Sequence, residues 1–178
     1  MSDPTAVVAA TIGPREGISM AFLRPADAER VRQRLAAELE GDVEITLFAA
    51  PASGLFIPGR EESTTGKQAQ SLLTEVADLS ERIHLRVVNP RTDPDEATAY
   101  GVELDPAVVI EKRAVDGEAK PDAGRVRMYG LPSGYEFMTL LDAMIAASRV
   151  VPALRPDTLE ALGRITDPMH LQVFVTPT

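Results

Sequence analysis

The order of helical and strand patterns along the chain is the sequence feature that most constrains its fold. Apolar residues recur at helical spacing over residues 25–41, and a strand pattern follows over 43–49. A second helical face, capped by Ser63, and a strand pattern over 83–88 come next. Two strands joined by a helix form a parallel pair through a right-handed crossover. The first half of the chain therefore predicts a β–α–β unit preceded by a helix.

The next part of the sequence predicts a short helix and a β-hairpin. Asp93 and Pro94 open the short helix, and Gly101 ends it. The hairpin strands cover residues 107–110 and 125–129, with turn signals between them. We interpret the acidic residues around Pro94 as a favourable helix N-terminus, because negative charge is stabilised there.

The last helix of this series is predicted to be buried, because residues 137–147 are apolar over most of the helix surface. Ser133 and Glu136 form a capping box before it, and Tyr135 and Phe137 are predicted to lie in the core. The complete order is helix–β–α–β–α–β–β–α. It predicts an α/β fold with a central mixed sheet flanked by helices.

A possible internal repeat suggests how the chain is divided. Leu23-Arg24-Pro25 and Leu154-Arg155-Pro156 each open a helical pattern, and each is followed by a strand that ends Phe-x-x-Pro. A duplicated domain explains this, and chance similarity between two helix–strand pairs is the alternative. We expect a buried strand over 171–175, whose hydrogen-bonding partners are not supplied by later residues. The predicted division is an N-terminal extension (1–24), a first unit (25–150) and the start of an incomplete second unit (151–178).

Composition and charge exclude several classes of function. The 27 acidic residues outnumber the 18 Lys and Arg, which argues against nucleic acid or an anionic membrane as a partner. The chain has no cysteine, so it can form neither disulfides nor thiolate sites of its own. His84 and His170 are the only histidines, and no carboxylates at ligand spacing accompany them. We therefore predict no metal, no cofactor and a cytoplasmic location.

Two segments are similar to a known family. Residues 129–137 (Tyr-Gly-Leu-Pro-Ser-Gly-Tyr-Glu-Phe) and 173–178 (Val-Phe-Val-Thr-Pro-Thr) resemble the tandem-thioredoxin-fold protein disulfide oxidoreductases, also called glutaredoxin-like proteins. Leu72-Leu73 and Tyr100-Gly101-Val102 fit the same pattern. The flavoprotein subunit of alkyl hydroperoxide reductase shares this layout in its N-terminal domain. The resemblance covers roughly residues 26–178. It implies a thioredoxin-like fold, plus the opening helix and strand of a second such unit.

In that family a Cys-x-x-Cys motif lies where the first strand meets its helix, because a helix N-terminus lowers the pKa of a thiol. The corresponding residues here run from Ser63 through Thr64 to Gly66. Ser63 stands at the nucleophile position, and Gly66 stands at that of the resolving thiol. A serine hydroxyl ionises too weakly for disulfide exchange, so this unit is predicted to be redox-inactive. The resemblance places the second unit's motif just after Thr178. A truncated chain and a protein that lost both sites are the two explanations.

The resemblance also implies a cis peptide bond between Asp105 and Pro106, facing the helix N-terminus and bordering a groove for an extended peptide. From the residues alone, this bond would be predicted to be trans. The predicted groove consists of Ser63, Thr64, Asp105 and Pro106. The acidic side chain of Asp105 would disfavour the approach of a thiolate. We expect the long loop over 52–62 to project into solvent rather than to fold over this site.

The predicted function is that of a scaffold or docking unit linked to thiol–disulfide exchange and cell redox homeostasis, without thiol chemistry in this chain. The expected partners are protein or peptide substrates, and a thioredoxin reductase-like flavoprotein is a further candidate. A non-catalytic peptide- or protein-binding module is the alternative. We also expect self-association through residues 171–175, because an unpaired apolar strand invites pairing. A phosphate-binding loop at Gly59–Lys67 is rejected, because the spacing of its glycines is too long.

Overall fold

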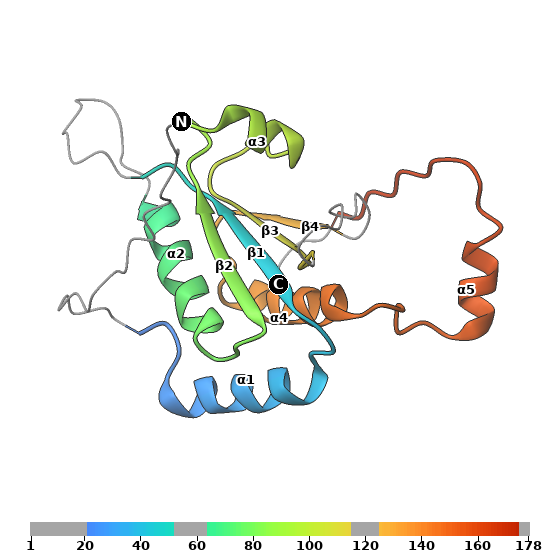
Figure 1. Cartoon of the computed structure of the whole chain (residues 1–178), viewed down its shortest axis with the longest axis horizontal. Coiled ribbons are helices and arrows are strands. Elements are labelled where there is room, and N and C mark those ends of the chain that lie inside the picture. The colour runs from blue at the N-terminus through green and yellow to red at the C-terminus, as the bar shows by residue number, and fades with distance from the viewer. Residues whose placement is uncertain (1–20, 52–63, 115–124, 175–178) are drawn as a thin grey trace, which may run out of the picture.

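The computed structural model describes residues 21–51, 64–114 and 125–174 (Figure 1). Its order of elements agrees with the prediction for residues 25–150. In chain order the elements are α1 (Pro25–Glu38), β1 (Val43–Phe48), α2 (Thr64–Ala77), β2 (Ile83–Val88), α3 (Pro94–Ala99), β3 (Ala107–Lys112), β4 (Val126–Tyr129), α4 (Tyr135–Ser148) and α5 (Pro156–Leu162).

The four strands form one mixed sheet in the order β2-β1-β3-β4. β1 pairs in parallel with β2, with Val43 opposite Ile83, as the β–α–β pattern predicted. β1 also pairs antiparallel with β3, and β3 pairs antiparallel with β4, so the hairpin prediction is confirmed as well. The connection between β3 and β4 lies outside the described residues. β1 is thus an inner strand that carries hydrogen bonds on both edges.

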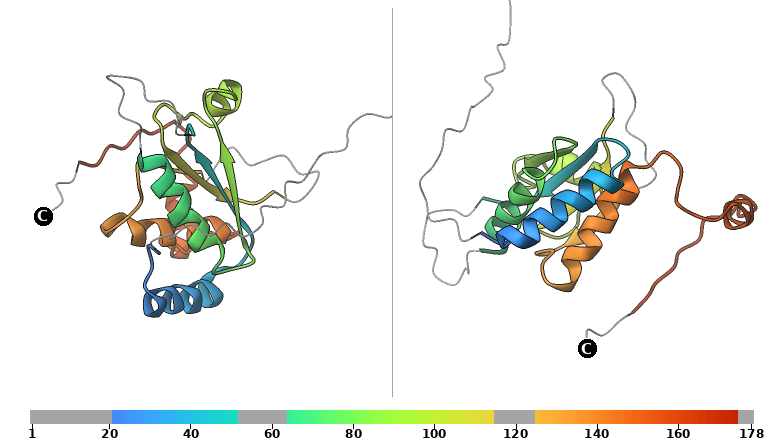
Figure 2. Two further views of the ribbon diagram at one scale, coloured as in Figure 1. Left: turned by 90° about the vertical axis from the view of Figure 1, so that its left-hand side faces the viewer. Right: turned by 90° about the horizontal axis from the view of Figure 1, so that it is seen from below.

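Three helices cover one face of the sheet. α1, α2 and α4 pack against alternate residues of the strands, among them Val43, Ile45 and Leu47 of β1. Among the described residues, the helix on the opposite face is the short α3, which packs over Phe48 and Val109 near one end of the strands. Figure 2 shows α3 and α4 on opposite sides of the sheet. One face is therefore fully covered, and the other is covered over part of its length.

Helix α4 is buried on one side as predicted, but two details of its N-terminus differ from the prediction. The N-cap is Gly134, with φ of 59° and no side-chain cap hydrogen bond, so the predicted capping box is wrong. The N-cap thus lies one residue after the predicted cap, Ser133, at a glycine whose positive φ other residues rarely adopt. Ser133 accepts a bond from the Glu136 N–H through its backbone oxygen instead. Tyr135 is 89% exposed, so its predicted core position is wrong, whereas Phe137 packs against the core.

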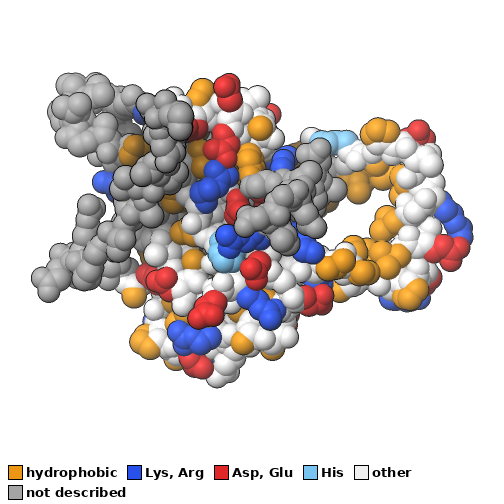
Figure 3. Space-filling model, in the orientation of Figure 1, with side chains coloured by type: hydrophobic (Ala, Val, Ile, Leu, Met, Phe, Trp, Pro, Cys, Tyr) orange, Lys and Arg blue, Asp and Glu red, His pale blue; other side chains and the backbone are white. Residues whose placement is uncertain are grey.

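The predicted strand near the C-terminus is wrong over residues 171–174, which have no regular structure. Phe174 is 89% exposed, and His170 is not part of a strand either. The alternation of apolar residues predicted a strand, but a strand also needs a neighbour, and no described strand pairs with this segment. α5 has no buried residue, and with its flanking segments it projects from the sheet (Figure 1). Apolar side chains gather on this projecting part (Figure 3).

We predict that two methionines of α4 differ sharply in their contribution to stability. Met144 is 0% exposed and Met138 is 53% exposed. Met144→Ala leaves a cavity and should lower the free energy of unfolding by about 2–5 kcal/mol. Met138→Ala, the matched control, should change it by less than about 0.5 kcal/mol. Denaturant unfolding measures both, and equal effects would contradict the packing described for α4.

Candidate functional site

The candidate site lies where the parallel strands β1 and β2 end and α2 begins. After β1, Ala49, Ala50 and Pro51 lead away from the sheet, and α2 returns over its edge. A cavity of about 210 Å³ opens at this corner. It is lined by Ala49, Ala50, Pro51, Gly66, Lys67, Gln70, Val87 and Asn89. Its walls combine small and apolar residues with the polar Lys67, Gln70 and Asn89.

The structure places the predicted motif residues at the start of α2. Thr64 is the first helical residue and is exposed, while Gly66 lies in the first turn and is buried. Ser63 lies outside the described residues. A Cβ at Gly66 would approach the Cβ of Ala49 to 3.3 Å, which is tighter than ordinary van der Waals contact. The helix start therefore lies directly against the end of β1, with only the Ala49 methyl group between them.

The peptide bond between Asp105 and Pro106 is cis, in agreement with the expectation from the resemblance. Pro106 is buried, and its carbonyl accepts a hydrogen bond of 2.9 Å from the Gly130 N–H. The Asp105 side chain accepts from the Ala50 N–H, with distances of 3.2 and 3.3 Å to its two oxygens. The acidic group beside the predicted groove is thus hydrogen-bonded to the chain that leaves β1. Ala50 links the two parts of the site, because it lies close to both Asp105 and Gly66.

The cavity and the cis proline lie on opposite sides of β1. Pro106 precedes β3, which pairs with one edge of β1, whereas Val87 and Asn89 belong to β2 and its end, on the other edge. The predicted groove did not include Lys67, Gln70, Val87 or Asn89. The spacing of Lys67 and Gln70 puts them on one side of α2. No sequence signal joined them to Val87, because that proximity depends on how α2 packs against β2.

A network of charged side chains occupies the partly covered face of the sheet. Glu111 is only 2% exposed, and its carboxylate accepts from Arg125 at 2.7 Å and from the Tyr100 hydroxyl at 3.0 Å. Glu44 lies opposite Glu111 in the β1–β3 register, and Arg86 approaches it at 3.5 Å. The buried Glu111 is therefore paired with Arg125 and the half-buried Glu44 with Arg86, as charges removed from water require.

The same network explains part of the acidic cluster at α3. Glu96 binds Arg86, so it does more than favour the helix N-terminus. Burial disfavours the charge on Arg86, but the hydrogen bond that Arg86 donates to Glu96 and nearby negative charge outweigh this effect and raise the pKa of Arg86. Asp93 occupies the N-cap position of α3, although its side chain accepts from the Thr92 hydroxyl rather than capping the helix. We interpret these contacts as structural, since each charge that they bury is compensated.

The described residues contain neither a metal centre nor a membrane-spanning helix. No group of three or more His, Asp or Glu side chains there is arranged to hold a metal ion. None of the helices in that part of the chain has the length and apolar character that crossing a bilayer requires.

Comparison with known proteins places the fold in a class. No protein-family model and no curated protein sequence matches the chain. Among solved structures it is similar to the NTD N/C domain of the alkylhydroperoxide reductase AhpF from Enterococcus faecalis, with 22% identity and a TM-score of 0.62. That match covers 78% of this chain and 59% of the other. The fold of this chain is thioredoxin-like.

A second solved structure supports the same class. The chain is similar to a protein disulfide oxidoreductase from Aeropyrum pernix, with 23% identity and a TM-score of 0.59. This match covers 79% of the chain and 54% of that protein. The chain thus spans less than two thirds of the length of either protein, and at this identity the likeness concerns the fold alone.

We predict that Gly66→Ala destabilises the protein despite its helical position. Replacing glycine inside a helix normally gains up to about 1 kcal/mol, but overpacking costs about 1–3 kcal/mol. The Ala49 Cβ is held by the strand end and cannot easily move away, so we expect a net loss of roughly 1 kcal/mol in the free energy of unfolding. In an Ala49→Gly background the same change should instead be neutral or stabilising. Denaturant unfolding of the four proteins of this double-mutant cycle measures the coupling, and a stabilising Gly66→Ala in the otherwise unchanged protein would contradict the close approach.

Proposed function

We propose that this chain is a non-catalytic thioredoxin-like unit linked to thiol–disulfide exchange, which serves as a scaffold or docking unit in a protein of the disulfide oxidoreductase type. One observation carries the proposal. The end of the fold that presents the exchanging thiols in that family is retained here, with the cis Asp105–Pro106 bond beside the start of α2, yet the sequence has no cysteine. The fold is kept while the reactive sulfur is absent.

The packing at Gly66 supports this proposal. The residue at the resolving position lies against Ala49, and even a Cβ would be crowded there. The carboxylate of Asp105 lies nearby, bound to Ala50, and its negative charge would oppose the formation of a neighbouring thiolate. Steric and electrostatic conditions thus both disfavour exchange chemistry at this end of the sheet.

The wider expectations from the sequence stay proposals. We propose that residues 151–178 open a second thioredoxin-like unit and that the protein acts in cell redox homeostasis in the cytoplasm, with protein substrates and a thioredoxin reductase-like flavoprotein as partners. The exposed apolar side chains of this segment, such as Leu171 and Phe174, support packing against structure outside the described residues.

A peptide-binding module without chemistry is the second candidate, and the surface near Pro106 favours it. Leu104 and Tyr129 are exposed apolar residues on either side of that proline, since Leu104 precedes the cis bond and Tyr129 pairs with Ala107. Such a rim could hold the apolar side chains of an extended peptide while the exposed Thr64 contacts its backbone.

We predict that the chain does not accelerate the reduction of insulin by dithiothreitol. The reaction needs a thiolate that attacks the disulfide and a second thiol that releases the mixed disulfide, and the sequence offers neither. Turbidity of the insulin B chain measures the rate, with an active dithiol oxidoreductase as the positive control. A rate above that of dithiothreitol alone would overturn the proposed function.

The peptide-binding candidate has its own test. We predict that cysteine-free peptides on an array bind the unchanged protein and the conservative variant Thr64→Ser alike, and that Thr64→Trp abolishes binding by filling the groove beside Pro106. Because Thr64 is exposed, both variants should fold, and thermal unfolding checks this. Binding that survives Thr64→Trp would exclude this groove as the binding site.

A further inference from the structure

The outer edge of β2 is the least protected edge of the sheet. No strand in the described residues lies beyond β2, which has six residues and contains neither proline nor lysine. Its Val87 is 44% exposed. Natural sheets usually protect such an edge with proline, inward charges, bulges or a covering loop. The opposite edge, β4, is shorter, and its Arg127 side chain donates to the Tyr100 carbonyl.

The direction of the backbone groups on β2 follows from the parallel pairing with β1. The carbonyls of Arg82 and Val88 accept bonds from Val43 and Ala49, so both face β1. In a parallel pair, alternate residues bond to the same neighbour. The peptide groups of Ile83, Leu85 and Val87 therefore face outward. The Ile83 N–H is bonded to Ser80, and within the described residues no backbone hydrogen bond uses the outward groups of Leu85 and Val87 or the carbonyl of Ile83.

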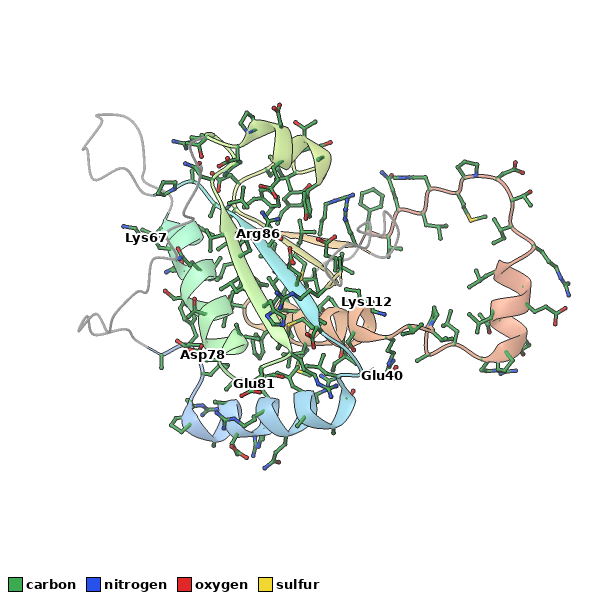
Figure 4. The ribbon with its side chains drawn as sticks, in the orientation of Figure 1. Glu40, Lys67, Asp78, Glu81, Arg86 and Lys112 are labelled. Atoms are coloured by element: carbon green, nitrogen blue, oxygen red, sulfur yellow. The ribbon has the colours of Figure 1, made fainter. Side chains whose placement is uncertain are left out.

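Charges flank this edge at both ends with opposite sign. Lys67 lies beside Val87, since both line the same cavity, whereas Asp78 and Glu81 lie where α2 leads into β2. Figure 4 shows Lys67 and Asp78 at opposite ends of α2. All three side chains are exposed, and none forms an ion pair with any residue in the described ranges. The edge thus carries Lys67 at one end and Asp78 and Glu81 at the other, where Arg82 is also exposed and donates to the Leu39 carbonyl.

We propose that this edge is a self-association site, at which two copies of the chain join β2 to β2 in antiparallel fashion and form one continuous sheet. A two-fold axis at Leu85 makes the edge self-complementary, as a symmetric dimer requires. The Leu85 peptide groups of the two copies bond to each other, and each Val87 N–H donates to the Ile83 carbonyl of the other copy. The Lys67 of one copy then lies close to Asp78 and Glu81 of the other.

A second copy fits this edge better than an unrelated strand, because the charges and the outward backbone groups of the edge are complementary to those of a second copy. Antiparallel pairing about Leu85 puts the positive end beside the negative end twice, and the outward groups of Val87 meet those of Ile83 twice. The apolar side chains of Leu85 and Val87 lie on the face that carries α2, so the two α2 helices would flank the new pairing. The site is distinct from the surface beside Pro106 and does not depend on the proposed function.

The test compares two substitutions at one residue. Val87→Pro removes the outward N–H without removing a bond to β1, and proline is tolerated on a free edge. Val87→Ala keeps the N–H and removes the same exposed side chain. By sedimentation equilibrium of the full chain at physiological salt, where the overall repulsion is screened, we expect a dimer for the unchanged protein and for Val87→Ala. Val87→Pro should raise the dissociation constant by roughly tenfold or more, since the symmetry removes two hydrogen bonds.

Reversing the charges at the two ends of the edge provides an independent test of the dimer. Lys67→Glu should weaken the dimer, and combining it with Asp78→Lys and Glu81→Lys should restore it, while circular dichroism shows that all variants are folded. A monomer at every concentration for the unchanged protein would overturn the proposal. So would equal association of Val87→Pro and Val87→Ala, or a dimer that is lost only with Leu171→Asp and Val173→Asp, which would place the contact in the C-terminal segment.

Discussion

The structure depends on the burial and double pairing of β1. This strand is hydrogen-bonded to β2 on one edge and to β3 on the other, and only Glu44 among its residues is not fully buried. Every other part of the fold is placed relative to it. The three helices of one face pack on Val43, Ile45 and Leu47, and α3 packs on Phe48. Since an unpaired backbone group in this position would be costly, the stability of β1 depends on both neighbours.

Much of this fold could be predicted from the sequence where local pattern and tertiary context agree. β2 begins and ends at the predicted residues, because turn residues bound it and its apolar side chains face the helices. The prediction failed where the local sequence pattern alone does not determine the structure. Residues 171–174 alternate like a strand yet have no neighbouring strand in the described residues, and Gly134 shifts the start of α4 by a backbone angle that no side-chain pattern reveals.

In the candidate site, too, some features could be predicted from the sequence and others could not. The cis bond before Pro106 was expected only because of the resemblance, since the residues themselves favour the trans form. The position of Gly66 at the start of α2 followed from counting along the chain, whereas Ser63 lies outside the described residues. The cavity beside Val87 was missed, because its walls come from segments that are distant in sequence and meet only after α2 packs on β2.

The contact between Gly66 and Ala49 has a consequence for that cavity. A single methyl group separates the first turn of α2 from the end of β1, so the smallest residue in the helix sets how closely the two elements approach. Lys67 and Gln70 follow on the same rigid helix and form one wall of the cavity. Any added volume at Gly66 would tilt this wall outward. The width of the cavity thus depends on a lining residue that has no side chain, and a change at Gly66 would alter which guests fit even with Lys67 and Gln70 unchanged.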